Sequence, residues 1–528
     1  MFPILPVVVS VLAALLSIEA DPAGFWLPSL AIWTPLAAIV ISIMPACIAR
    51  LRARRILLLA ASPDTDWDRL GARFQRTGRV LGILAVASYL IVLFGLRWPD
   101  WIREASLPEA IPLLDELLLF APFLIASLGT YVEEQRLAMM ASGSRTPSLS
   151  ERVSFQVRGL LFPLAPLAAL AAARDLVALS GFEDHFVLFG YVGWAAMAVF
   201  VVALFALAPF LMRYLLRMRS LEPGPLREDL DELAGRIGFR CRDILVWETG
   251  GRLVNAALVG LAAPLRYVIL TDGLIARFPA CEVRAVFAHE AAHGLKGHTV
   301  FYLVVALVFL LLFYPLGEFL PEDGSIVLPT LIAAGFLGFY WFVLFGFVSR
   351  RVEREADLFG AHAAEDVGAM IGAMGRIASL SGERSERFSS WRHFSTPRRI
   401  RTLERFVSEP GMLGRATRAR RSLVVAVVAL LFAGVAASAS VAPRDHLRGH
   451  IQLALAEGRF DALDRSLARA RERYPDDPLF VFMEGIGAAE RGLDADARAR
   501  FERALELVPG EALRRSIEDA LAELDSEP

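Results

Sequence analysis

Two histidines with a glutamate between them are the residues of this 528-residue chain best suited to do chemistry. They are His289, Glu290 and His293, in the pattern H-E-x-x-H. The residues just before them have helical apolar spacing, and positions i and i+4 of a helix project from one face. Two imidazoles on one face can bind a zinc ion, while the glutamate reaches a water beside it. The alternative is a surface helix that carries two histidines and no metal.

A catalytic zinc also needs a third protein ligand and an open coordination position. Glu353 and Asp357 again stand at i and i+4, directly after two apolar runs at 299–319 and 325–348. A hairpin of two membrane spans would return this segment to the membrane surface at which the histidines lie. We therefore predict Glu353 as the third ligand. Asp357 is predicted to accept a hydrogen bond from a ligating imidazole. Without the histidine motif, this segment would be an ordinary charged helix beside a membrane.

The elements that position these residues belong to a membrane protein. The chain is 55% hydrophobic and 21% charged, with a mean hydropathy of +0.49, and is more apolar than soluble domains are. Its apolar runs have the length of membrane-crossing helices, about twenty residues. The net charge of −2 argues against a nucleic-acid binder, and three cysteines exclude a disulfide framework. Nine spans are predicted, at 2–18, 27–48, 78–97, 109–131, 159–180, 185–212, 299–319, 325–348 and 423–442.

Arginine clusters orient these spans, because basic residues in short loops face the cytoplasm. Five clusters follow the second, sixth and eighth spans, separate the fourth from the fifth, and precede the ninth. All five fall on one side of an alternating topology, which makes 219–298 and 349–422 cytosolic and puts the C-terminal tail on the opposite side. The first span is interpreted as a retained helix rather than a cleaved signal peptide. Lys296 is the one lysine among 55 basic residues, a bias typical of a GC-rich bacterial genome, so we expect a bacterial inner membrane.

Charged residues inside membrane spans are costly and draw attention. Asp115 and Glu116 fall in the fourth predicted span, and Arg174 and Asp175 in the fifth. They could line a polar cavity. The favoured interpretation is that they pair within the helical bundle or lie near its ends.

The C-terminal segment 443–528 is charged, alanine-rich and helical in pattern. Two stretches match at a spacing of 34 residues, with Gly458 and Gly492, Ala470 and Ala504, and Pro475 and Pro509 in register. This is the period of tetratricopeptide repeats, which are helix–turn–helix units. The segment therefore resembles about two such repeats. They are predicted either to bind a peptide or protein partner or to form a helical hairpin that only packs.

The order of the motifs resembles that of the integral-membrane zinc peptidases, which include the CAAX prenyl endopeptidase type 1 and the heat-shock protease HtpX. Both share H-E-x-x-H, a membrane hairpin and then E-x-x-x-D. Residues 293–299, H-G-L-K-G-H-T, resemble the run that follows the motif in the prenyl endopeptidase branch. Asn255 and Ala256, followed by 267–275, resemble the strand pair of the family. The similarity covers about residues 225–405.

The resemblance implies a mainly α, polytopic membrane protein with a small α+β zincin-like catalytic domain and, beyond it, a C-terminal α-hairpin repeat domain. Two stretches, 219–298 and 349–422, would form the catalytic domain, and the intervening 299–348 the membrane hairpin. The remaining predicted parts are the N-terminal membrane bundle 1–218, the last span 423–442 and the repeats 443–528.

The resemblance also implies roles for residues that follow the third ligand. His393 and Arg399 match the histidine and arginine of the family in spacing, although Phe394 replaces the usual proline. Aligning on Thr396-Pro397 instead would lose the histidine. By resemblance His393 hydrogen-bonds the tetrahedral intermediate, and the alternative is a solvated histidine in a basic loop. Of the other histidines, His298 is predicted to cap or anchor at the membrane edge and His362 to be structural, while the last two, His446 and His450, lie across the membrane.

These inferences point to a membrane-embedded zinc endopeptidase with one Zn²⁺ per chain. Glu290 would act as general base, and His393 would stabilise the oxyanion. The strand that contains Asn255 and Ala256 would bind an extended substrate as an added strand. The expected partners are a peptide or membrane-protein substrate, in quality control or peptide processing, the lipid bilayer, and a protein that binds the repeats; nucleic acid is not expected. The alternatives are a non-catalytic scaffold that acts through its repeats, and a transporter, for which the paired repeats or broken helices are not apparent.

Overall fold

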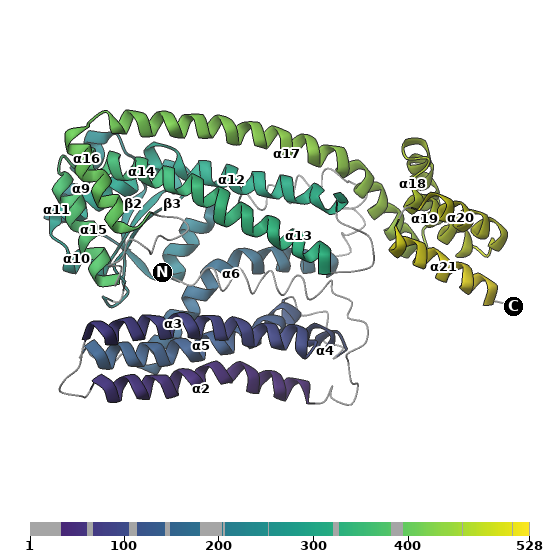
Figure 1. Ribbon diagram of the computed structural model, residues 1–528, viewed down its shortest axis with the longest axis horizontal. Coiled ribbons are helices and arrows are strands. Elements are labelled where there is room, and N and C mark those ends of the chain that lie inside the picture. Colours follow the sequence, from purple (N-terminus) through teal and green to yellow (C-terminus); the bar gives the residue numbers. More distant parts are fainter. Residues whose placement is uncertain are drawn as a thin grey trace. The chain divides into compact units, whose positions relative to one another are not determined.

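The structure of the protein, a computed structural model, describes residues 33–60, 67–104, 113–142, 148–179, 203, 206–251, 253–319, 327–381, 394–456, 458–508 and 510–526 (Figure 1). The chain divides into two compact units. One comprises Met1–Leu295 and Gly360–Ser385, and the other Lys296–Phe359 and Glu386–Pro528. Helix α14 (Gly346–Ala363) is continuous through this division, so residues of both units lie on one helix.

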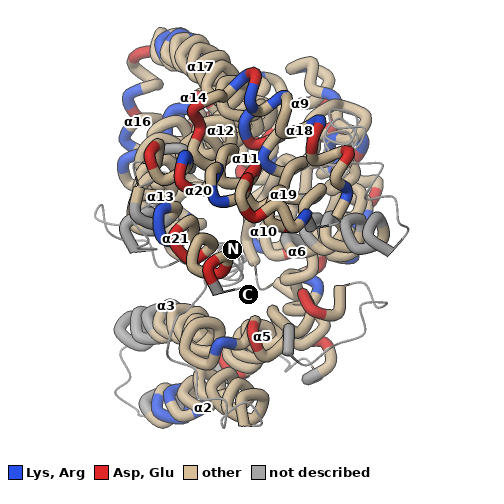
Figure 2. Tube along the Cα trace, turned by 90° about the vertical axis from the view of Figure 1, so that its right-hand side faces the viewer, with Lys and Arg blue, Asp and Glu red and all other residues tan. Residues whose placement is uncertain are grey.

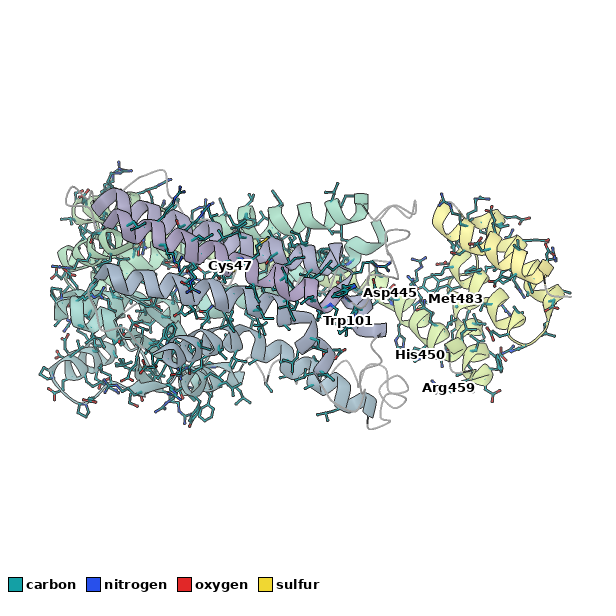
Figure 3. All side chains as sticks on the ribbon, turned by 90° about the horizontal axis from the view of Figure 1, so that it is seen from below. Cys47, Trp101, Asp445, His450, Arg459 and Met483 are labelled. Atoms are coloured by element: carbon teal, nitrogen blue, oxygen red, sulfur yellow. The ribbon has the colours of Figure 1, made fainter. Side chains whose placement is uncertain are left out.

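The first unit begins with a bundle of apolar helices. These are α2 (Thr34–Ala60), α3 (Trp67–Leu90), which continues as a π-helical turn to Gly95, α4 (Trp98–Glu104), α5 (Leu114–Ser142) and α6 (Leu149–Leu179). Buried Tyr89 and Trp98 donate hydrogen bonds to carbonyl groups of α5, at 3.2 and 2.9 Å. Leu36 and Cys47 are exposed, as a lipid-facing surface requires. Cys47 is labelled in Figure 3.

A four-stranded sheet completes the first unit, in the order β1-β2-β4-β3. Its strands are β1 (Met218–Ser220), β2 (Asp243–Trp247), β3 (Ala256–Val259) and β4 (Tyr267–Thr271). Strands β2 and β4 are parallel, and the other two pairs are antiparallel. Every residue of β4 is buried, so helices must cover both faces. The helices of this part of the unit are α9 (Pro225–Ile237), α10 (Asp272–Arg277), α11 (Ala280–Leu295) and α15 (Val367–Ser381).

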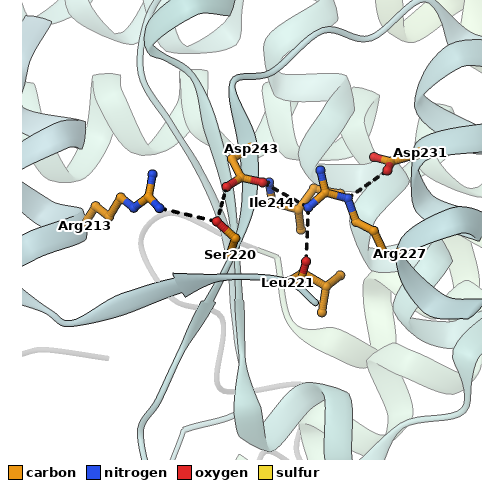
Figure 4. A network of polar contacts seen from close by, with 7 residues as sticks. All are labelled: Arg213, Ser220, Leu221, Arg227, Asp231, Asp243 and Ile244. Carbon is orange, nitrogen blue, oxygen red and sulfur yellow. Dashed lines mark hydrogen bonds and ion pairs between the residues drawn. The ribbon is translucent and has the colours of Figure 1, made fainter. Parts of the chain in front are cut away.

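A polar network fixes the start of this sheet (Figure 4). Asp243, at the beginning of β2, accepts hydrogen bonds from Ser220 of β1 and from Arg227 of α9. Arg227 also binds Asp231 at 2.8 Å and the Leu221 carbonyl at 3.3 Å. One carboxylate thereby ties two strands and a helix together, which sets the edge of the sheet opposite β3.

The second unit contains a hydrophobic hairpin and a long helix. Helices α12 (His298–Phe313) and α13 (Val327–Gly338), which continues through a π-helical stretch into α14, pack through Phe309, Tyr340 and Trp341. The Tyr340 hydroxyl donates to the Val305 carbonyl at 2.6 Å. After α16 (Thr396–Ser408), α17 (Met412–Ala456) packs along α12, where Ser438 donates to the Leu311 carbonyl at 2.8 Å.

Four shorter helices end the chain: α18 (Phe460–Arg473), α19 (Pro478–Ala489), α20 (Asp494–Leu507) and α21 (Glu511–Ser526). Gly458 and Gly492 both adopt the left-handed conformation, with φ of 63° and 69°, in the turns before α18 and α20. Ala470 and Ala504, also 34 residues apart, are fully buried. Charged residues are frequent along α20 and α21 (Figure 2). This geometry fits the predicted helical pairs, and their assignment as tetratricopeptide repeats stays a prediction.

Five described helices are long and apolar enough to cross a membrane: Thr34–Ile56, Leu114–Glu134, His298–Leu316, Leu331–Ala363 and Met412–Gln452. They correspond to the second, fourth, seventh, eighth and ninth predicted spans. The third predicted span falls on a shorter apolar helix, Val80–Gly95, and the fifth overlaps α6, which ends at Leu179. The first lies outside the described residues, as does most of the sixth. The total of nine therefore stays a prediction, and α17 continues beyond 442, where the ninth predicted span ends.

The charged residues of the fourth and fifth spans lie near helix ends. Asp115 and Glu116 occupy the first turn of α5, where carboxylates interact favourably with the helix dipole. Arg174 and Asp175 lie in the last two turns of α6, and their side chains are outside the described residues. The position of the first pair agrees with the favoured interpretation.

Candidate metal centre

Helix α11 presents both histidines of the motif on one side. Its opposite side is buried through Val283, Phe287 and Ala291, which fixes the rotation of the helix. The Nε2 atoms of His289 and His293 lie 3.3 Å apart, and their rings are inclined by 76°. Both imidazoles therefore direct a nitrogen toward the same point.

Helix α14 supplies a third donor at this point. The ligand atoms of His289, His293 and Glu353 all lie within 4.8 Å of one another. Gly360 explains how closely α14 approaches α11, because a Cβ at this position would lie 2.9 Å from the His289 backbone nitrogen. Glu353 stands seven residues before Gly360, about two helical turns, and hence on the same face of α14.

The donor set fits a zinc ion. With Zn–N bonds of about 2.0–2.1 Å, two ligands at a tetrahedral angle are about 3.3–3.4 Å apart. The observed separation of 3.3 Å between the imidazole nitrogens matches this value. Two histidines and one carboxylate are also a typical ligand set of catalytic zinc sites, which keep a fourth position open.

Glu290 lies beside the edge strand β3. The Leu258 amide donates a hydrogen bond of 2.9 Å to its Oε2 atom. In the antiparallel register of β3 with β4, the Asn255 carbonyl accepts from Thr271, so the Leu258 amide points to the free edge. The backbone of the edge strand thus positions this carboxylate. Because the contact is made by a main-chain amide, no pattern of side chains in the sequence predicts it.

The predicted residues of the edge strand have different environments. The Asn255 side chain is exposed, and its backbone amide donates to the Thr271 hydroxyl at 3.0 Å. Ala256 is half-buried and begins β3. By the alternation of the register, the backbone groups of Ala256 face the free edge, as those of Leu258 do.

Asp357 is held by Arg399. Its two carboxylate oxygens accept hydrogen bonds of 2.9 and 2.6 Å from Nε and Nη2 of the guanidinium, a bidentate pair in which Asp357 is buried. The structure thus pairs Asp357 with the arginine that matches the family in spacing, and the predicted hydrogen bond from a ligating imidazole to Asp357 stays a prediction. His393 lies outside the described residues, but the neighbouring Phe394 ring has the guanidinium groups of Arg354 and Arg398 within 5.0 and 4.2 Å.

Sequence reasoning missed Glu355, which lies between the two predicted carboxylates. It is fully buried and contacts His298 at 3.1 Å, Thr417 at 2.7 Å and Arg420 at 2.6 Å. His298 is therefore bound to α14, while Gly297 occupies the N-cap position of α12. The predicted anchoring of His298 at the membrane edge stays a prediction. The available signal was the helical period itself, since a residue two positions after Glu353 faces the opposite side of the helix.

Asp272 secures the loop that leads into β3. Burial favours its neutral form, but the Thr249 hydroxyl and the amides of Gly251 and Gly273 donate to it at 2.6, 2.9 and 2.8 Å and lower its pKa. Cys241 lies two residues before β2, and burial raises the pKa of its thiol to about 11. A raised pKa disfavours the thiolate, which is the reactive form of cysteine.

Comparison with known proteins adds an independent observation. Residues 220–407 match Peptidase family M48. The protease HtpX of Pseudomonas entomophila is 28% identical over 255 residues, which are 43% of this chain and 85% of that protein. CAAX prenyl protease 1 of Saccharomyces cerevisiae is 33% identical over 113 residues, 20% of this chain and 25% of that protein.

A similar solved structure is that of S. mikatae Ste24p. The similarity covers 72% of this chain and 99% of that chain, with a TM-score of 0.42 and 19% sequence identity. The range 220–407, which matches the family, contains the three clustered donors His289, His293 and Glu353. It also contains Glu290, Asp357 and Arg399. It corresponds to the range of about 225–405 over which the sequence resembles the membrane zinc peptidases.

Proposed function

Because the chain belongs to peptidase family M48 through residues 220–407, we propose that it is a membrane-embedded, zinc-dependent endopeptidase. His289, His293 and Glu353 would hold the ion. The observation that carries this proposal is the convergence of their donor atoms within 4.8 Å, from two helices and two sequence motifs. A zinc ion there would supply Lewis-acid chemistry, polarising the scissile carbonyl and acidifying a water molecule.

Glu290 is the proton carrier in this proposal. Its carboxylate would take a proton from the attacking water and deliver it to the leaving amine. The Leu258 amide, at 2.9 Å from Oε2, keeps the carboxylate directed along the edge of β3. An extended peptide added to this edge at Ala256 would present its backbone beside Glu290, with main-chain hydrogen bonds supplying affinity. Asp357 and Arg399 would hold the helix face that carries Glu353, and His393 would stabilise the oxyanion.

The cellular setting follows from the arginine clusters. They support a site on the cytoplasmic side of a bacterial inner membrane and C-terminal helices on the opposite side. Peptides or membrane proteins would be the substrates, in quality control or peptide processing. The C-terminal helical pairs would bind a protein partner.

The test is zinc content and proteolysis of the full chain in detergent. Wild-type protein should contain about one zinc per chain and cleave casein. Glu353→Ala should lose the zinc, whereas Glu290→Gln should keep it and lose about 10²–10⁴-fold in cleavage rate, the usual contribution of a general base. Wild-type protein that binds no zinc after supplementation would refute the ligand assignment. Zinc retained with cleavage unaffected in Glu290→Gln would refute the role of this residue.

A further inference from the structure

A second cavity lies in the first unit, away from the metal centre. It has a volume of about 150 Å³, smaller than the usual site of a whole drug-sized ligand, and is lined by Phe155, Arg158, Leu216, Arg217, Trp247 and Glu248. Its strand residue, Trp247, belongs to β2, and Leu216 and Arg217 directly precede β1. Strands β1 and β3 are three steps apart in the sheet, roughly 14 Å at the usual strand spacing. The cavity is therefore separate from the edge strand beside Glu290.

The cavity lies where apolar helices end. Arg158 directly precedes the apolar part of α6, and Arg217 follows the apolar helix Ala206–Leu215. The wall is aromatic, because Phe155 stacks on Trp247 at 6.1 Å and on Tyr131 at 6.4 Å. Tyr131 lies in the last turn of the candidate span Leu114–Glu134. Tryptophan and tyrosine at the ends of apolar helices are typical of the depth of lipid headgroups.

The charge of the cavity is positive. Arg158 has a buried Nη1 atom without a hydrogen-bond partner in the described structure. Burial and the neighbouring charge of Arg217 lower the pKa of the Arg158 guanidinium, so two like charges face one space. The one carboxylate of the lining, Glu248, is bound to Arg219 at 2.7 Å. An anion in the cavity would relieve the repulsion and satisfy the buried donor.

Backbone conformation adds a further sign of a specific site. Arg217 has φ of 50°, in the left-handed region that residues other than glycine, asparagine and aspartate rarely adopt. Such conformations cost free energy and are concentrated at ligand sites. The strained residue is one of the two arginines that line the cavity.

We propose that this cavity binds the phosphate group of an anionic phospholipid, with Arg158 and Arg217 as its ligands. Guanidinium groups bind phosphate oxygens in a bidentate manner, and basic pockets between membrane helices accept anionic headgroups. The acyl chains would lie along the apolar helices that end at the cavity. A lipid in this position would fasten β1 and β2 to the membrane surface, and with them the sheet that carries β3 at its other edge.

The experiment is native mass spectrometry of the full-length protein in detergent. Dioleoyl-phosphatidylglycerol, dioleoyl-phosphatidylcholine and inorganic phosphate are added separately. The matched control for Arg158→Gln/Arg217→Gln is Arg418→Gln/Arg421→Gln, which removes two exposed arginines from another cluster that precedes an apolar run. We expect phosphatidylglycerol to bind wild type and the control about tenfold more tightly than the double variant, as two charge-assisted contacts would require.

Equal loss of binding in both double variants would overturn the proposal, because general surface charge would then explain the affinity. Binding unchanged in Arg158→Gln/Arg217→Gln would overturn it too. Displacement of the lipid by inorganic phosphate at equal concentration would overturn the lipid as the source of the phosphate. If the double variant fails to fold, Arg217→Gln alone, whose side chain is exposed, should still weaken phosphatidylglycerol binding severalfold, and unchanged binding would refute the site.

Discussion

Glu355 and Asp357 stand two residues apart on α14, and each is bound by an arginine from a later helix. Glu355 is fully buried, and it joins α14 to α12 through His298 and to α17 through Thr417 and Arg420. Asp357 forms a bidentate pair with Arg399 of α16. Positions i and i+2 of a helix are about 200° apart, so the two carboxylates face nearly opposite sides.

The difference shows how α14 can present Glu353 on one face while contacts of the opposite face keep the helix in place. Burying a charge costs several kcal/mol unless partners and hydrogen bonds compensate for the lost water. Glu355 has three such partners on two other helices, all in a region that has no role in the proposed chemistry. Asp357 is bound by the planar guanidinium of Arg399, near the donors. The first carboxylate thus holds the helix, and the second orders the face that bears Glu353.

The largest effect on stability should come from removing the charge of Glu355, the fully buried carboxylate. Glu355→Gln removes the charge that compensates Arg420, and we expect the free energy of unfolding to fall by about 3–5 kcal/mol. The comparison variant is Glu353→Gln, measured in metal-free protein so that lost zinc does not contribute. Denaturant unfolding in detergent gives both values. If Glu353→Gln destabilises the metal-free protein as much as Glu355→Gln does, the two sides of α14 do not differ in the way we infer.

A smaller effect should come from the other side. Asp357→Asn weakens the bidentate pair with Arg399, and we expect zinc affinity to fall about 10–100-fold, as is usual when a group that orders a metal site is changed. The loss of unfolding free energy should be smaller than in Glu355→Gln. Competition with a chelator measures the affinity. Arg399→Lys keeps the positive charge but loses the planar guanidinium that binds both carboxylate oxygens, and it should also reduce zinc affinity. Unchanged zinc affinity in both variants would show that the Asp357–Arg399 pair does not order the metal centre.

The sequence analysis singled out Glu353 and Asp357, which belong to a motif on α14. It missed Glu355, which faces the other side of the helix and belongs to no motif. His289, His293 and Glu353 follow from residue types at helical spacing, and the family assignment is confirmed. The same spacing indicates that Glu355 faces away from Glu353 but not what it contacts, because its partners lie 57 to 65 residues away in the chain and nothing in their types distinguishes them from other polar residues.

Backbone geometry was also beyond reach. The strand pair at 256–271 was predicted, but the contact between the Leu258 amide and Glu290 depends on register rather than on a side chain. The cavity at Trp247 likewise collects residues from three separate segments. Span lengths were predicted least well, since an apolar run marks the membrane-embedded part of a helix and not its end. Helix α17 illustrates this, because it extends as far as Ala456.

A third carboxylate, Asp272, sharpens the comparison, because its described donors are neutral: the Thr249 hydroxyl and the amides of Gly251 and Gly273. Since its pKa is lowered in the folded protein, its ionised form stabilises the fold. That contribution is complete above the unfolded pKa, about 3.9, and disappears as pH falls through the lower folded value. We expect it to be the smallest of the three effects, since hydrogen bonds from neutral donors are weaker than an ion pair.

The stability difference between wild type and Asp272→Asn should therefore be constant near neutral pH and shrink below about pH 4. Thermal unfolding between pH 7 and pH 3 measures it. Other carboxylates titrate in the same range, so the difference between the two proteins carries the information, not either curve alone. Thr249→Val removes one of the donors and should reduce the acid-sensitive part without abolishing it. If the stability difference between the two proteins stays constant down to pH 3, the ionised form of Asp272 does not stabilise the fold. Among these three carboxylates, the negative charge would then contribute only in Glu355 and Asp357, which are paired with an arginine.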